Sequence, residues 1–98
     1  MSTNKSSLKS GKIQSVDRAL SILEIIADAD DGLTLAQIAQ RMELPKSTVH
    51  GLVSTLRDHK FVRQSEEDGR YQMGIQLFEL GTKLARSWDI RDAAKPAM

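Results

Sequence analysis

Residues 34–57 constrain the fold more than any other part of the chain, because they predict two short helices separated by a tight turn. Thr34 and Gln37 form a T-x-x-Q capping box, a pattern typical of a helix start. Glu43 and Pro45 then mark the turn, since a proline at the beginning of a helix loses no hydrogen bond. This spacing indicates a helix-turn-helix, a motif whose second helix enters the major groove of DNA.

The second helix of this motif, expected from about residue 46 to residue 59, has one apolar and one polar face. Its apolar side chains recur at i, i+3, i+4 and i+7, the spacing of a single buried face. The other face carries small polar and basic groups that suit the hydrogen-bonding base edges of the groove. The residues of the motif that we expect to contact DNA are Thr34, Gln37, Lys46, Ser47, Thr48, His50, Ser54, Thr55 and Arg57.

Several of these residues also have a purely structural interpretation. Ser47 and Thr48 could simply cap the helix, although the positive helix end and its N–H groups attract phosphate. His50 could be an ordinary surface histidine as readily as a donor to guanine N7 or to phosphate. Arg57 could form a salt bridge instead of reaching a phosphate. These alternatives stay open at the level of the sequence.

The flanking sequence predicts a further element before the motif and two after it. Ser15 is expected to N-cap a first helix that ends near Ala29, and residues 1–14 are expected to form a flexible tail. Two short strands around Asp68 and Gly69 predict a hairpin, which directly after such a helix is a wing. A fourth helix is expected from about residue 75 to residue 87.

The wing carries both basic and acidic residues. Arg63 and Arg70 lie on its strands, and arginine is favoured along the minor groove and the DNA backbone. The tip, Glu66 to Asp68, is acidic and phosphate would repel it. We therefore expect Arg70 to touch DNA while the tip points away.

The fourth helix has an apolar face that is broad for a small core. The simplest interpretation is core packing, but the excess breadth favours a homodimer contact. A dimer would place two recognition helices about one helical turn apart on DNA, which predicts a pseudo-palindromic operator. The residues expected to form this contact are Leu77, Leu80, Leu84 and Trp88.

Composition narrows the class of protein further. The formal net charge is only +1, but the charged residues are segregated. Lysine and arginine predominate in residues 1–18 and 46–63, while aspartate and glutamate gather in residues 28–31 and 66–68. The chain has no cysteine, and its two histidines lack metal-ligand spacing, so no metal or cofactor is expected. No segment is apolar enough to predict a membrane span or a signal peptide, and we expect a cytoplasmic location.

The order of helix, helix, turn, helix, wing and long helix resembles the N-terminal domain of the IclR family of bacterial transcriptional regulators. The matching segments are residues 15–23, 44–50, 61–62, 71 and 77–81. The resemblance implies a mainly α-helical fold with a small β-hairpin: a winged helix-turn-helix over residues 15–74 and a long linker helix over residues 75–90. It also implies that residues 91–98 begin a C-terminal domain that senses a small organic effector, and that the intact regulator is a dimer or tetramer.

Two residues depart from the family pattern. Gly51 stands where arginine is common, and glycine costs a helix about 1 kcal/mol relative to alanine. Glu43 stands where a turn glycine is common, and a positive φ there would cost on the order of 1 kcal/mol. Both departures bear on the operator sequence and the turn geometry rather than on the fold.

Two other classes of function compete with a DNA-binding repressor or activator. A protein-interaction or dimerisation module without sequence-specific DNA binding would predict an apolar or acidic recognition face, against which Lys46 and Arg57 argue. An enzyme is not expected, because no glycine-rich phosphate loop, nucleophile–base pair or convergent pair of carboxylates is visible.

Overall fold

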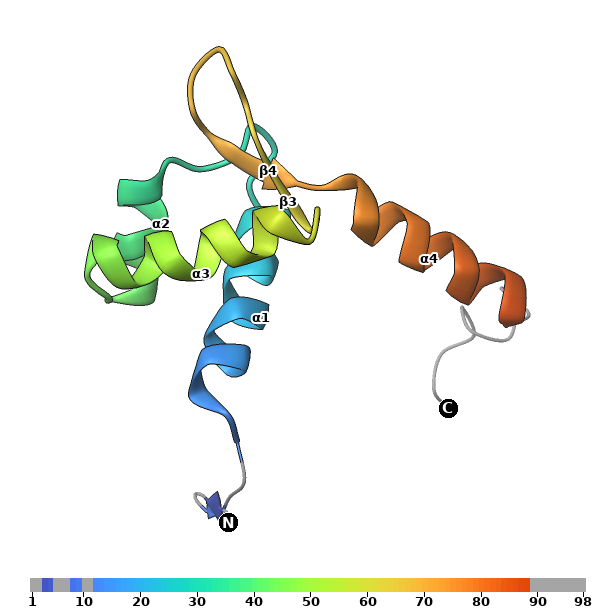
Figure 1. Ribbon diagram of the computed structural model, residues 1–98, viewed down its shortest axis with the longest axis horizontal. Helices are drawn as coiled ribbons and strands as arrows, with labels where there is room; N and C mark the ends of the chain where they lie inside the picture. Colours follow the sequence, from blue (N-terminus) through green and yellow to red (C-terminus); the bar gives the residue numbers. More distant parts are fainter. Residues whose placement is uncertain (1–2, 5–7, 10–11, 89–98) are drawn as a thin grey trace.

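The computed structural model describes residues 3–4, 8–9 and 12–88. Three helices cross one another beside an antiparallel hairpin, and a fourth helix points away from them (Figure 1). The helices are α1 (Gln14–Ala27), α2 (Leu35–Met42), α3 (Lys46–Asp58) and α4 (Ile75–Ser87).

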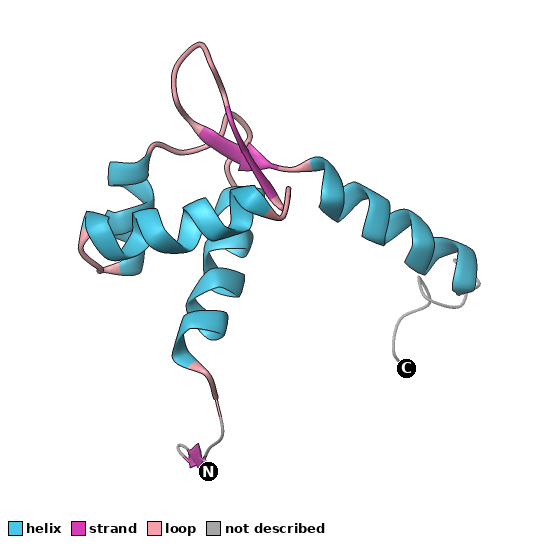
Figure 2. Ribbon diagram, viewed as in Figure 1, coloured by secondary structure: helices cyan, strands magenta, loops and turns pink. Residues whose placement is uncertain are grey.

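The strands form two separate hairpins, as Figure 2 shows. In the larger one, β3 (Val62–Gln64) pairs with β4 (Tyr71–Met73), with Arg63 opposite Gln72. In the other, β1 (Thr3–Asn4) pairs with β2 (Leu8–Lys9). The described part is therefore mainly α-helical with a wing after α3, and the predicted fold class is confirmed.

The hydrophobic core lies where α1, α2 and α3 meet the wing. Ile22 and Ile26 are buried one helical turn apart on α1, and Val49 and Val53 are buried at the same spacing on α3. Val62 is buried from β3. Burial of each such side chain contributes about 1.5–3 kcal/mol to the free energy of folding. The burial of Val49 and Val53 therefore fixes the orientation of α3 and leaves its polar face available to a ligand.

The start of α2 and the turn between α2 and α3 both have the predicted local structure. The Gln37 N–H donates to Thr34 Oγ1 at 3.1 Å, and the Thr34 N–H donates to Gln37 Oε1 at 2.9 Å, which completes the capping box. Glu43 has a φ of 57°, the left-handed conformation that the turn requires. Pro45 is the N-cap of α3, one residue before the first helical position.

The wing is attached to the helices through the loop between α1 and α2. The Leu33 N–H donates to the Tyr71 carbonyl at 3.0 Å, and the Tyr71 N–H donates to the Leu33 carbonyl at 2.7 Å. This pair of backbone hydrogen bonds extends the hairpin by one bridge. The wing therefore has a fixed position relative to α1 and α3, which a loose loop would lack.

Some predicted boundaries are wrong. α1 begins at Gln14 and its N-cap is Ile13 rather than Ser15, because the Asp17 N–H already donates to the Ile13 carbonyl. α1 also ends at Ala27, two residues before the predicted end, and α3 ends at Asp58.

Other predicted segments are only partly described. The predicted linker helix extends to residue 90, but α4 ends at Ser87, and residues 89–98 lie outside the described part. The pairing of β1 with β2 falls within the predicted tail of residues 1–14, much of which also lies outside the described residues. The flexibility of that tail remains a prediction.

Candidate nucleic-acid interface

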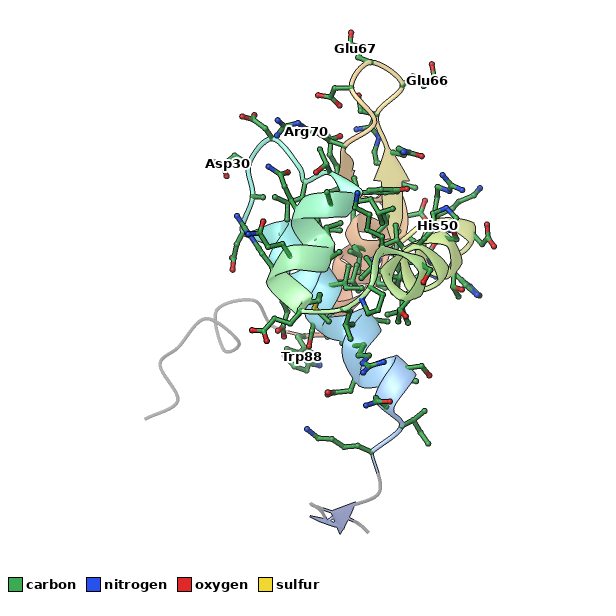
Figure 3. The ribbon with its side chains drawn as sticks, turned by 90° about the vertical axis from the view of Figure 1, so that its left-hand side faces the viewer. Asp30, His50, Glu66, Glu67, Arg70 and Trp88 are labelled. Carbon is green, nitrogen blue, oxygen red and sulfur yellow. The ribbon has the colours of Figure 1, made fainter. Side chains whose placement is uncertain are left out.

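The polar side of α3 forms one continuous stripe. At 100° per residue, positions 46, 47, 50, 54 and 57 fall within one arc of about 100° on the helix, and the buried Val49, Val53 and Leu56 lie outside it, with Val53 next to Lys46. Figure 3 shows His50 projecting outward from α3, on the side away from the loop that carries Asp30. We call these residues the recognition stripe: Lys46, Ser47, His50, Ser54 and Arg57.

Thr48 and Thr55 do not join the recognition stripe. They are seven residues apart, so they share the neighbouring side of α3, where Thr48 is half-buried. Thr55 Oγ1 donates to the Gly51 carbonyl at 3.0 Å, and Thr55 lines an apolar groove together with Leu52. The predicted contacts of Thr48 and Thr55 with DNA stay predictions, made from the side of α3 that neighbours the recognition stripe.

The N-terminus of α2 offers a second group of donors. Gln37 is exposed and uses its Oε1 atom to accept the Thr34 N–H, so its NH2 group remains as a donor. The Thr34 hydroxyl accepts a hydrogen bond in the same capping box and is part of the helix end rather than a separate polar group. The arrangement suits a phosphate oxygen, since the positive end of the helix lies at the same place.

Arg57 is bonded to the wing. Its Nη1 atom donates to Gln64 Oε1 at 2.7 Å, and Gln64 Nε2 donates to the Gly69 carbonyl at 3.1 Å. Among the described residues no carboxylate lies within 4.0 Å of Arg57, so the salt-bridge interpretation is not supported. Arginine has five N–H donors, which leaves Arg57 with capacity for a phosphate.

Arg70 is turned away from the recognition stripe, and its predicted contact with DNA stays a prediction. Its Nη1 atom donates to the Gly32 carbonyl at 3.4 Å, and its Nε atom lies 3.7 Å from Asp68 Oδ2. Figure 3 shows Arg70 beside the loop of Asp30 and away from His50, with Glu66 and Glu67 at the tip of the wing. The Arg70 backbone N–H, which donates to Asp68 Oδ1, holds the pKa of Asp68 below its ordinary value.

An apolar surface runs between α1 and α4. Leu77 and Leu80 line a groove of about 540 Å³ together with residues of α1 and α3. α4 has no buried residue, so the simpler interpretation of its apolar face as core is wrong. Val16 and Leu20 of α1 are 54% and 55% exposed. Leu80 and Leu84 of α4 are 43% and 48% exposed, and Trp88, which follows the helix, is 57% exposed.

The described part of the chain contains neither a cluster of potential metal ligands nor a helix that could cross a membrane. No three histidine, aspartate or glutamate side chains gather there as metal ligands. None of its helices combines the length and the apolar character needed to span a bilayer.

Gly51 lies beside the recognition stripe, and a Cβ atom added there would meet nothing within 4 Å. Gly51→Ala is therefore expected to raise the free energy of unfolding by about 1 kcal/mol, because alanine loses less backbone entropy in a helix. Circular dichroism melting should show an increase of a few degrees. Gly69→Ala, at a φ of 74°, should lower the melting temperature instead. An unchanged or lower melting temperature for Gly51→Ala would contradict the prediction.

The comparisons with known proteins agree with this geometry. The family model of the IclR helix-turn-helix domain matches residues 15–66. The chain belongs to the IclR family. It is 42% identical to the HTH-type transcriptional regulator XynR of Escherichia coli K12 over 83 aligned residues. These residues make up 85% of this chain and 33% of XynR. It is 34% identical over 88 residues to the transcriptional repressor IclR of the same organism, which covers 90% of this chain and 32% of that repressor.

Solved structures of the IclR family share the fold. The IclR-family regulator from Brucella abortus superposes with a TM-score of 0.70 at 30% identity, over 87% of this chain and 32% of that one. The Thermotoga maritima IclR superposes with a TM-score of 0.72 at 26% identity, over 85% and 33%. The chain spans about a third of the length of these IclR-family proteins. It contains the helix-turn-helix DNA-binding domain of a bacterial transcriptional regulator.

Proposed function

We propose that this IclR-family domain binds double-stranded DNA sequence-specifically, with α3 in the major groove and the wing near the minor groove or the backbone. The recognition stripe carries the proposal, because it places hydrogen-bonding side chains, all exposed except the half-buried Ser54, along one side of a helix that the groove can admit. Lys46 lies at the positive N-terminus of α3, where a phosphate is favoured. His50 and Ser54, farther along the stripe, are suited to base edges.

The same proposal includes a homodimer joined through Leu77, Leu80, Leu84 and Trp88 on a pseudo-palindromic operator. The exposed apolar surface between α1 and α4 supports it, because an unpaired apolar surface of this kind is costly in water. An isologous contact would relate two copies of α3 by a two-fold axis.

We extend the proposal to the whole regulator on the strength of its relatives. It would act as a repressor or activator in the bacterial cytoplasm, where its DNA lies, and would not be an enzyme. Relatives include a glycerol operon regulatory protein of Streptomyces coelicolor and an acetate operon repressor of Salmonella typhimurium. A small organic effector would act only through a further C-terminal domain, which could also support a tetramer.

Lys46→Ala and His50→Ala are expected to affect DNA binding in different ways. Lys46→Ala should weaken binding to operator and unrelated duplexes alike, and reduce the slope of log affinity against log salt by about one unit. His50→Ala should reduce the preference for the operator by roughly 5- to 100-fold, because a base contact contributes to sequence discrimination. Fluorescence anisotropy at several salt concentrations, with an operator selected from a random pool by the unaltered chain, measures both quantities.

Lys83→Ala, on the exposed surface of α4, is the control for loss of one positive charge. If Lys46→Ala and His50→Ala both leave operator affinity unchanged, α3 is not the recognition helix. If the unaltered chain binds no duplex even at low salt, a protein-interaction module becomes the better interpretation.

A further inference from the structure

Gly51 has no reason within the described chain to be a glycine. Gly32 and Gly69 have a positive φ, and a Cβ atom added at Gly74 would overlap backbone atoms. Gly51 instead lies inside α3 without a positive φ, and a Cβ atom there would meet nothing within 4 Å. The other described glycine of this kind, Gly81, lies on α4 among the residues proposed for the homodimer. Glycine destabilises a helix relative to alanine, and close approach of a ligand to the backbone is one use that offsets this cost.

The open space at Gly51 adjoins the recognition stripe. At the angular spacing of an α-helix, Gly51 lies about 40° from Ser47 and about 60° from Ser54. Gly51 is exposed, and both serine side chains are short. A base edge that accepts a hydrogen bond from either hydroxyl group would therefore lie close to the Gly51 Cα atom.

The surface of α3 beside Gly51 is apolar on the side away from the serines. The Gly51 carbonyl accepts a hydrogen bond from Thr55 Oγ1 at 3.0 Å. This bond uses the hydroxyl hydrogen of Thr55, so Thr55 offers a ligand its methyl group rather than a free donor. The major groove of DNA has one apolar group, the 5-methyl group of thymine, and a threonine methyl group is among its usual contacts.

We propose that the space at Gly51 receives the 5-methyl group of an operator thymine, against the methyl group of Thr55. Gly51 is then a specificity-determining residue, because any side chain at this position would occupy the space that the methyl group needs. The proposal rests on the proposed DNA binding and names one base that α3 selects. It also accounts for a glycine that the fold itself does not require.

Deoxyuridine measures what the methyl group contributes, because it pairs as thymine does and lacks only that group. The operator is selected from a random pool by the unaltered chain, and its thymines are replaced by deoxyuridine one at a time. Replacement at one position of a half-site should lower the affinity about fourfold in fluorescence anisotropy, as expected for the loss of one buried methyl group. An operator in which no thymine is sensitive to the replacement would overturn the proposal.

Gly51→Ala should reverse the preference at the sensitive position. The added Cβ atom takes the space of the methyl group, so the affinity for the thymine operator should fall about tenfold, as for one mismatched base pair. Deoxyuridine at that position should then raise the affinity of this variant instead of lowering it. The variant is expected to be more stable than the unaltered chain, so unfolding cannot cause the loss. An alanine variant that keeps the affinity and the thymine preference of the unaltered chain would overturn the proposal.

Thr55→Ser tests the second half of the contact, because it removes the methyl group and keeps the hydroxyl group. It should reduce the preference for thymine over deoxyuridine at the sensitive position. Thr82→Ser is the matched control, since Thr82 Oγ1 donates to the Phe78 carbonyl at 2.8 Å in the same arrangement on α4. This control should keep the preference of the unaltered chain. An unchanged preference in Thr55→Ser would overturn the part assigned to Thr55.

Failure of this contact is distinguishable from failure of the proposed DNA binding. If the unaltered chain selects an operator but tolerates deoxyuridine at every thymine, the contact at Gly51 alone is overturned. If the unaltered chain selects no sequence and binds no duplex even at low salt, the proposed DNA binding is overturned together with the contact.

Discussion

Gly74→Ala is expected to destabilise the domain by on the order of 3 kcal/mol, which is the upper range for overpacking a buried site. An added Cβ atom would lie 2.3 Å from the Lys60 carbonyl oxygen and 2.8 Å from backbone atoms of Phe61 and Val62. All three are backbone atoms, so no side-chain rotation can relieve the overlap. Thermal unfolding followed by circular dichroism should show a loss of roughly 10–20 °C.

The cause of this loss is steric and not conformational. Gly74 has a φ of −96°, which any residue adopts, and its N–H donates to the Phe61 carbonyl at 2.8 Å. The position therefore needs glycine only because the backbone after α3 passes so close to it. Gly51→Ala, where space is open, is the matched control. A melting temperature for Gly74→Ala within 3 °C or so of the unaltered chain would show that the close approach is not rigid.

The helix-turn-helix could be predicted from the sequence because its signals are local. The capping box of Thr34 and Gln37 depends on residues three positions apart, and the left-handed Glu43 depends on the turn that follows α2. The apolar spacing of Val49 and Val53 reports directly which face of α3 is buried. Each signal is complete within a few residues, so tertiary contacts had little to add.

The wing contacts could not be predicted in the same way. Whether Arg63 or Arg70 is available for a ligand depends on the loop that lies beside β4. The Gly32 carbonyl and Asp68 both engage the Arg70 guanidinium, and Gly32 is far from Arg70 in the sequence. Residue type and the alternation of side chains along a strand carry no information about the contact between Arg70 and the loop of Gly32.

The apolar face of α1 illustrates a different limit. Val16 and Leu20 have the helical spacing of the apolar residues around them, yet each is about half exposed. Amphipathic spacing indicates that a helix face is apolar but not what covers it. The same uncertainty applied to α4, where the pattern was compatible with both a core and a second copy of the chain.

Leu80→Asp is expected to reduce affinity for an operator with two half-sites by on the order of 100-fold, while affinity for a single half-site stays unchanged. Leu80 is 43% exposed and lines the groove between α4 and α1, so a carboxylate there would prevent an apolar contact between two chains. The loss would arise because joining two binding modules multiplies their affinity, and separated copies lose that gain. Sedimentation of protein–DNA mixtures should then show one chain in place of two on each operator.

Folding stability provides the control that makes this result decisive. α4 has no buried residue, so Leu80→Asp should change the melting temperature by no more than a few degrees. Thr82→Asp adds the same charge on another side of α4 and should leave both affinities intact. If Leu80→Asp affected half-site and full-operator binding equally, the surface would serve the fold or the DNA contact, and the homodimer proposal would fail. If it affected neither, two copies on one operator would act independently, and the exposed apolar residues of α1 and α4 would need another partner.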